Sequence, residues 1–268
     1  MRTLRVIVKA AALACLTLIA VYGGRKLFVH VYAQSPTRIR PYHLEDEQIF
    51  VKDGKEKILS RTTKVRNQTG AIHELSVRYG DKSGAPGHGD VTFRSARFPD
   101  GTTALIQDSI RAKATAKLPE KELAARNASL RHPADCVEPG EIVEAHEQLF
   151  GQDAIRESIP QDKEGKKRLL GWRLLGFDCL VAQDFMQERS STAEPWQTVM
   201  GNRLTVFYEA EPDPVLFTNW QGYAEMKPSD MKRKWAQAEG FTPETCAPCF
   251  QPDPSDGNYV KWHQGGQR

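Results

Sequence analysis

Residues 71–79, AIHELSVRY, indicate the fold class of this chain. Their apolar and polar side chains alternate, and the apolar set is Leu75, Val77 and Tyr79. Successive side chains of a β-strand point to opposite faces of the sheet. The alternation therefore predicts a strand with one buried and one solvent-facing side, which is typical of an antiparallel sheet.

The flanking sequence continues this pattern in both directions. Upstream, KILSRTTKVR (57–66) is joined to residues 71–79 by the turn sequence NQTG, so the two segments predict a hairpin. Downstream, the glycine-rich residues 80–90 predict a loop. Residues 91–98 and 102–110 flank a Pro-Asp-Gly turn and predict a second hairpin.

The second half of the chain predicts further strands. Residues 141–159 fit either a helix or a hairpin that turns at Phe150-Gly151. We favour the hairpin, because an internal glycine costs a helix about 1 kcal/mol. The other predicted strands are residues 167–177, 179–189 and 203–211.

Two segments carry helix signals. Residues 117–130 contain Pro119 and two acidic residues, which suit the first turn of a helix. Near the C-terminus, Ser229 is the expected N-cap of a helix that ends at Gly240. The apolar face of this second helix is thin and consists of Met231, Trp235 and Ala238, so we expect the helix on the surface or edge of the sheet.

Together these elements predict an α+β fold that is mainly antiparallel β, a curved sheet with a few helices and an N-terminal hydrophobic helix. The expected order is a signal peptide or membrane anchor (1–33), a linker (34–47), a β-rich domain (48–242) and a cysteine-containing tail (243–268). Within the domain, strand-rich halves at about 48–110 and 141–210 are joined by a helix-containing segment.

The N-terminus has the composition of an export signal, with a basic start followed by an apolar run at residues 10–22. That run is too short for a bilayer-spanning helix of about 20 residues, but residues 6–24 together reach this length. Arg25 and Lys26, directly after the run, oppose translocation. A cleaved signal and a retained inner-membrane anchor both stay open. Either one predicts a periplasmic or extracellular domain, with the membrane as a partner of the N-terminus alone.

The charge distribution argues against a nucleic-acid partner. Five Lys and Arg residues lie within the first 33 positions, and without them the formal net charge changes from +3 to −2. Non-specific binding to nucleic acid needs clustered positive charge against the phosphates.

The cysteine count predicts disulfide bonds. Cys15 lies in the export segment, which leaves Cys136, Cys179, Cys246 and Cys249 in the exported domain. An even number of cysteines in an exported chain favours disulfides, and four cysteines allow three pairings. We favour Cys136 with Cys179 and Cys246 with Cys249.

The motif TCAPCF (245–250) also raises a redox interpretation. A thioredoxin-type site places its first cysteine at a helix N-terminus, where the thiolate is stabilised. Here Pro252 and Pro254 follow closely and are incompatible with such a helix. Haem attachment requires histidine at position 250, which is Phe, and an oxidising compartment disfavours a zinc site. A structural disulfide is the favoured interpretation, with redox activity and zinc binding as alternatives.

No catalytic or metal-binding signature is complete. HELSV at His73 and HEQLF at His146 lack the second histidine of the zinc-protease motif. GAPGHG (84–89) has glycines but no following helical pattern, so a plain loop is favoured over a phosphate site. His88 in that loop is the best outlying candidate, because exposed loops often carry function. We therefore predict no catalytic residue, no metal and no cofactor.

Two segments resemble a known group of proteins. They are residues 151–183 and EPDPVLFTNWQGYAEMKPSDM (211–231). They resemble uncharacterised secreted proteins of acidobacterial-type soil bacteria that end in an acidic-Pro-Asp-Pro-x-Leu-Phe segment, then Gly-Tyr-x-Glu and Pro-Ser. The resemblance spans about residues 130–250 and implies no activity. The overall layout is also similar to bacterial outer-membrane lipoprotein carriers and periplasmic stress sensors, whose curved sheet covers an apolar cavity.

The sequence thus favours an exported, non-enzymatic binding module for an apolar small molecule or a lipid. The first alternative is a thiol–disulfide redox protein that uses Cys246 and Cys249. The second is a hydrolase with a site around His73, His88 or His146.

Overall fold

A computed structural model describes residues 39–80, 89–128, 136–137 and 140–260 of the chain. The N-terminal segment 1–33, with its predicted hydrophobic helix and anchor at 6–24, lies outside these residues, as does His88. Among the residues described, no helix has the length and hydropathy needed to cross a membrane.

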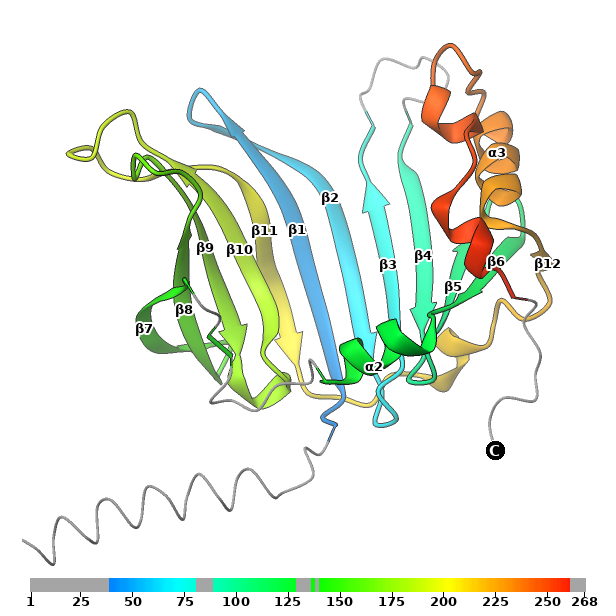
Figure 1. Ribbon diagram of the computed structural model, residues 1–268, viewed down its shortest axis with the longest axis horizontal. Coiled ribbons are helices and arrows are strands. Elements are labelled where there is room, and N and C mark those ends of the chain that lie inside the picture. The colour runs from blue at the N-terminus through cyan, green and yellow to red at the C-terminus, as the bar shows by residue number, and fades with distance from the viewer. Residues whose placement is uncertain (1–38, 81–88, 129–135, 138–139, 261–268) are drawn as a thin grey trace, which may run out of the picture. The chain divides into compact units, whose positions relative to one another are not determined.

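The described chain forms one open, curved, twelve-stranded sheet (Figure 1). The strand order is β12-β6-β5-β4-β3-β2-β1-β11-β10-β9-β8-β7. Every pair is antiparallel except β12 with β6. The strands are β1 (Tyr42–Lys52), β2 (Lys55–Arg66), β3 (Ile72–Arg78), β4 (Val91–Arg97), β5 (Thr102–Gln107), β6 (Ala112–Lys117), β7 (Ile142–Leu149), β8 (Gln152–Pro160), β9 (Lys167–Leu174), β10 (Leu180–Glu188), β11 (Gln197–Tyr208) and β12 (Ala224–Glu225).

Two α-helices and four short 3-10 helices complete the described residues. The α-helices are α2 (Glu120–Ala128) and α3 (Pro228–Ala238). The 3-10 helices are η2 (Leu175–Phe177), η3 (Pro214–Phe217), η4 (Ala247–Phe250) and η5 (Pro254–Asn258). The mainly antiparallel β prediction and the small number of helices are confirmed.

The two strand-rich halves form a single sheet, because β1 pairs with β2 on one side and with β11 on the other. The helix-containing segment leads from β6, next to the edge strand β12, to β7 at the opposite edge of the sheet. The turn between β7 and β8 has the backbone conformation of a tight hairpin. Phe150 and Gly151 both have positive φ, at 51° and 73°, between β7 and β8. This backbone matches the twist of the flanking strands and admits glycine most easily.

Two boundaries differ from the sequence expectations. β1 begins at Tyr42, inside the stretch 34–47 expected to be a linker. Tyr42 and Leu44 are buried while the residues between them are polar, and a short alternation at a highly charged strand end is hard to separate from a linker. In α3, the N-cap is Lys227 and Pro228 occupies the first turn, so Ser229 is not the cap. Pro at this position needs no N–H partner.

Side chains pack on both faces of the sheet. In β3, His73 and Leu75 point to one face, and Glu74 and Ser76 to the other. On the first face, the His73 ring lies 6.2 Å from the ring of Phe217 in η3. On the second face, Ser76 is opposite Phe93 of β4, which contacts α3. The segment after β11 and the helix α3 therefore cover opposite faces of the same strands.

Candidate functional site: an apolar pocket beneath α3

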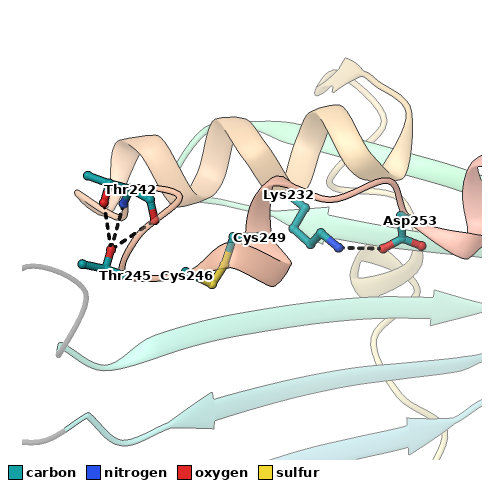
Figure 2. The surroundings of a disulfide bond; sticks show 6 residues. All are labelled: Lys232, Thr242, Thr245, Cys246, Cys249 and Asp253. Atoms are coloured by element: carbon teal, nitrogen blue, oxygen red, sulfur yellow. Dashed lines mark hydrogen bonds and ion pairs between the residues drawn. A yellow bond between two sulfur atoms is a disulfide. The ribbon is translucent and has the colours of Figure 1, made fainter.

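A pocket of about 400 Å³ lies between α3, η4 and the strands β3, β4 and β5. Figure 2 shows η4 with its disulfide lying between α3 and the strands. The residues that line the pocket are Glu74, Ser76, Phe93, Arg94, Ser95, Leu105, Ile106, Gln107, Pro228, Met231, Lys232, Trp235, Pro248, Cys249 and Asp253. The cavity falls within the range of about 300–1,000 Å³ that is typical of small-molecule sites.

Large apolar side chains from the sheet and the helix form its walls. Phe93 and Leu105 are 45% and 39% exposed, although both lie within strands of the sheet. From α3, Met231 and Trp235 complete the apolar lining, and the rings of Trp235 and Phe93 lie 5.8 Å apart. A ligand that covered Phe93 and Leu105 would remove apolar surface from water, which is worth about 25 cal/mol per Å².

Several polar side chains at the pocket, including Gln107 and Lys232, have protein partners. In the amide orientation that suits both neighbours, Gln107 donates to the carbonyl of Thr92 and accepts from the indole N–H of Trp235, at 3.1 and 3.0 Å. The Lys232 ammonium lies 3.4 Å from the Asp253 carboxylate (Figure 2). This leaves an apolar interior with polar groups already engaged.

The charged groups of the sheet around the pocket are also compensated. The Glu74 carboxylate pairs with Lys64 and Arg97 at 3.6 and 3.2 Å. Arg94 pairs with Asp108 at 2.7 Å. Neither sign of charge is therefore in clear excess at the pocket, which favours a ligand without a net charge in its buried part.

The tail after α3 is fastened across the helix. The Asp256 carboxylate accepts a hydrogen bond from the backbone N–H of Ser229, at 2.9 Å. Hydrogen bonding from the Ser229 side chain and then from its backbone lowers the pKa of Asp256. Tyr259 forms a bridge with Ala116 of β6. The segment that carries η4 is thus held at its far end, and it forms one wall of the pocket.

The structure pairs Cys136 with Cys179 and Cys246 with Cys249, with Cα atoms 5.4 Å apart in each pair. The first pair lies in a cluster with Ile155. This is the pairing that the sequence favoured.

The geometry of the CAPC motif does not support the redox-enzyme alternative. Cys246 precedes η4, a 3-10 helix of four residues. Thiolate stabilisation at a helix N-terminus depends on a longer run of aligned peptide dipoles. The described residues also contain no group of three His, Cys, Asp or Glu side chains arranged to hold a metal ion.

A second pocket of about 410 Å³ lies on the opposite face of the sheet. It is lined by His43 and His73, which the register brings together: His43 is opposite Val65, and Val65 is opposite His73. Sequence spacing gave no sign of this pairing, because the histidines come from β1 and β3, thirty positions apart. His146 is on β7, at the far edge of the sheet.

The two histidines of this second pocket have different environments. Burial, followed by the positive charge of Arg94, lowers the pKa of His73 to about 4. The Arg94 Nε lies 3.4 Å from His73 Nε2, which suits a neutral imidazole as the acceptor. His43 lies 2.9 Å from the Glu45 carboxylate and stacks on Tyr208 with 4.7 Å between ring centres. The contacts of His43 and His73 do not form a nucleophile–base pair.

Sequence reasoning missed most of the pocket under α3. It identified Met231 and Trp235 as the thin apolar face of the helix, and that face does contribute to the lining. Phe93 and Leu105 read as ordinary strand residues. The sequence signal that could have identified Phe93 and Leu105 is that these large apolar side chains lie on the same sheet face as the polar Glu74 and Ser76.

Comparison with known proteins finds only distant likenesses. No protein-family model and no curated protein matches the chain. Among solved structures, it is similar to a chain of the Pseudomonas aeruginosa MucA/MucB complex, with 12% identity and a TM-score of 0.34. That match covers 65% of this chain and about half, 54%, of the other.

Two further structures have lower TM-scores. An outer-membrane lipoprotein-sorting domain from Vibrio parahaemolyticus has 9% identity and a TM-score of 0.27, over 72% of this chain and 96% of that one. A DUF1329 family protein from Desulfovibrio piger has 14% identity and a TM-score of 0.18, over 74% and 96%. At these identities and TM-scores the likenesses assign no function to this chain. The resemblance to the soil-bacterial group stays a prediction.

Proposed function

We propose that this protein is an exported, non-enzymatic binding module that holds an apolar small molecule, or the acyl part of a lipid, in the pocket beneath α3. The observation that carries this proposal is the exposure of Phe93 and Leu105 inside a cavity of about 400 Å³. Large apolar side chains that face a well-formed concave space favour ligand binding over simple packing.

The electrostatics of the pocket support binding rather than catalysis. Catalysis needs an acid, base or nucleophile within reach of a reacting atom. The charged groups at the pocket are engaged in ion pairs: Glu74 with Lys64 and Arg97, Lys232 with Asp253, and Arg94 with Asp108. The site therefore offers mainly apolar surface to the apolar part of a ligand.

The proposed location follows from the N-terminal export signal and from the two disulfides. Disulfides persist in oxidising compartments such as the bacterial periplasm. We propose that the described domain resides in the periplasm or outside the cell, where free apolar molecules need a carrier or a binding partner in water.

A pair of matched substitutions tests the pocket. Leu105→Trp enlarges a pocket-facing side chain, and Val181→Trp makes a similar enlargement at an exposed position of β10 outside the pocket. The full chain is titrated with N-phenyl-1-naphthylamine, an apolar dye whose fluorescence rises on burial. We expect saturable binding by the wild type and by Val181→Trp, and binding about tenfold weaker or worse for Leu105→Trp, a difference of about 1.4 kcal/mol.

Mass spectrometry of organic extracts of the protein, purified from the cell envelope, identifies any ligand that co-purifies. Absence of saturable dye binding, or equal binding by Leu105→Trp and the wild type, would overturn the proposal for this pocket.

A further inference from the structure

The terminal disulfide is part of the pocket wall. Cys249 lines the pocket beneath α3 and is 8% exposed, whereas Cys246 is half-buried and precedes η4. Cys246 is therefore the more exposed member of the pair, and Cys249 is the more buried member. A thiol–disulfide exchange begins at the sulfur that an incoming thiolate can reach.

The second disulfide differs in its accessibility. Cys136 is fully buried and Cys179 is 6% exposed, within a cluster that contains Ile155. An external thiolate reaches neither sulfur without local unfolding. Of the two disulfides in the described residues, only the terminal pair has a member open to attack in the folded protein.

The disulfide is one of the contacts that hold η4 in the pocket wall, together with the packing of η4 on α3. On one side, the backbone N–H of Cys246 donates to the carbonyl of Thr242, at 2.9 Å. On the other, Asp253 pairs with Lys232, and Asp256 accepts from the N–H of Ser229. Between these anchors, the disulfide, the hydrogen bond from Cys249 N–H to the Cys246 carbonyl and packing against α3 restrict the segment that carries Pro248 and Cys249.

The anchors and the disulfide have separate consequences. If the disulfide opens, the ion pair and the helix cap still keep the tail on α3, so the fold survives. The short segment that carries Pro248 and Cys249 gains conformational freedom, because the cross-link no longer restricts it. A ligand in the pocket would then have to order that segment as it binds, which weakens its affinity.

We propose that the Cys246–Cys249 disulfide is a reversible exchange site for a reduced protein dithiol of the cell envelope, and that its opening loosens the pocket and releases the ligand. The regulatory part rests on the proposed function of the same pocket. The chain is the substrate of the exchange, and it does not act as an oxidoreductase on other proteins.

The exchange conserves atoms and electrons. A thiolate of the dithiol attacks the Sγ atom of Cys246, the Cys246–Cys249 bond breaks, and Cys249 leaves as a thiolate that takes up a proton. The second thiol of the reductant then loses its proton and attacks the first reductant sulfur, which is bonded to Cys246 in the mixed disulfide. Cys246 leaves as a thiolate and takes up a proton. Two electrons pass from the dithiol to the cysteine pair, and the reductant becomes a disulfide.

The first measurement locates the exchange. The full chain is incubated with increasing concentrations of dithiothreitol, a small dithiol probe, and then alkylated and analysed by peptide mass spectrometry. We expect Cys246 and Cys249 to be labelled at concentrations at which Cys136 and Cys179 remain bonded. Simultaneous opening of both pairs, or earlier opening of the Cys136–Cys179 pair, would overturn the exchange site.

The second measurement tests the effect on the pocket. Binding of N-phenyl-1-naphthylamine is compared among oxidised protein, selectively reduced and alkylated protein, and the Cys246→Ser/Cys249→Ser variant. We expect the dissociation constant to rise about tenfold in both altered forms, as the loss of a short-loop cross-link implies. A change of less than about twofold in both forms would overturn the gating role.

The two proposals fail in different ways. If the oxidised wild type does not bind the dye, or if Leu105→Trp binds it equally well, the pocket proposal fails, while the alkylation pattern still decides the exchange site. If the oxidised protein binds and Leu105→Trp does not, but reduction leaves the affinity unchanged, the pocket stands and the gating role is wrong. Thermal melting verifies that the double serine variant is folded, and the reduced wild type gives the same comparison if it is not.

Discussion

The indole ring of Trp235 on α3 lies 5.8 Å from the ring of Phe93 on β4, and its N–H bonds to Gln107 at the end of β5. This one side chain therefore connects the C-terminal helix to two strands of the sheet and lines the pocket at the same time. Any ligand in the pocket contacts an aromatic side chain whose emission depends on its surroundings.

Trp235 should report ligand binding directly. Trp235→Phe keeps most of the apolar lining but removes the hydrogen bond to Gln107, so we expect a loss of about 1 kcal/mol in the free energy of unfolding. The change in tryptophan emission on binding an apolar ligand should also disappear. Fluorescence titration checks this, with Trp196→Phe as the control, because Trp196 lies between Arg168 and Arg189, away from the pocket. An unchanged ligand response in Trp235→Phe would contradict the assignment.

The two disulfides should contribute unequally to stability. The Cys136–Cys179 pair spans 43 positions and the Cys246–Cys249 pair spans three. In the chain-entropy treatment these loops correspond to about 4 and about 2 kcal/mol. We therefore expect Cys136→Ser/Cys179→Ser to lower the free energy of unfolding more than Cys246→Ser/Cys249→Ser. Urea denaturation measures both, and a larger loss in the terminal pair would contradict the prediction.

His73 should give the protein a defined pH dependence. Its pKa in the folded state is lowered to about 4 from an ordinary value of 6.5. The unfolded chain therefore binds more protons between these values, and stability is lost as the pH falls from about 6.5 towards 4. The full effect is at most about 3 kcal/mol.

The variant His73→Gln removes this titration. We expect the difference in unfolding free energy between wild type and variant to change across pH 4 to 6.5 and to be constant above about pH 7. Denaturant unfolding at several pH values measures the difference. A difference that is the same at pH 4.5 and pH 7 would show that His73 does not cause the dependence.

Gly201 should be intolerant of any side chain. It lies on β11 opposite Phe185, and a Cβ atom there would approach the Asp184 carbonyl oxygen to 2.2 Å and the Phe185 Cα to 2.8 Å. Both contacts involve backbone, which cannot move without disturbing the β10–β11 pairing. We expect Gly201→Ala to destabilise the protein by about 2 kcal/mol or more. Gly222→Ala is the matched control, since nothing lies within 4 Å of a Cβ at that position, and equal melting temperatures for the two variants would contradict the prediction.

The sequence by itself determined the elements that depend on neighbouring residues. The strand at AIHELSVRY is visible because successive side chains of a strand must alternate between two faces. The hairpin at Phe150-Gly151 is visible because a tight turn needs a residue that accepts positive φ. The prediction of an export signal and the count of cysteines likewise require only local composition. These features led to an antiparallel sheet with disulfides.

The contacts that depend on strand register, and on the path of the C-terminal tail back to the sheet, are visible only in the tertiary structure. Pairing of β1 with β11 joined two apparent halves into one sheet, and the path of the tail placed Cys249 beside Leu105 at a single pocket. His43 and His73 met only through two successive strand pairings. These contacts link residues many positions apart, and their register is set by the summed burial of whole strand faces. No local pattern in the chain encodes that sum.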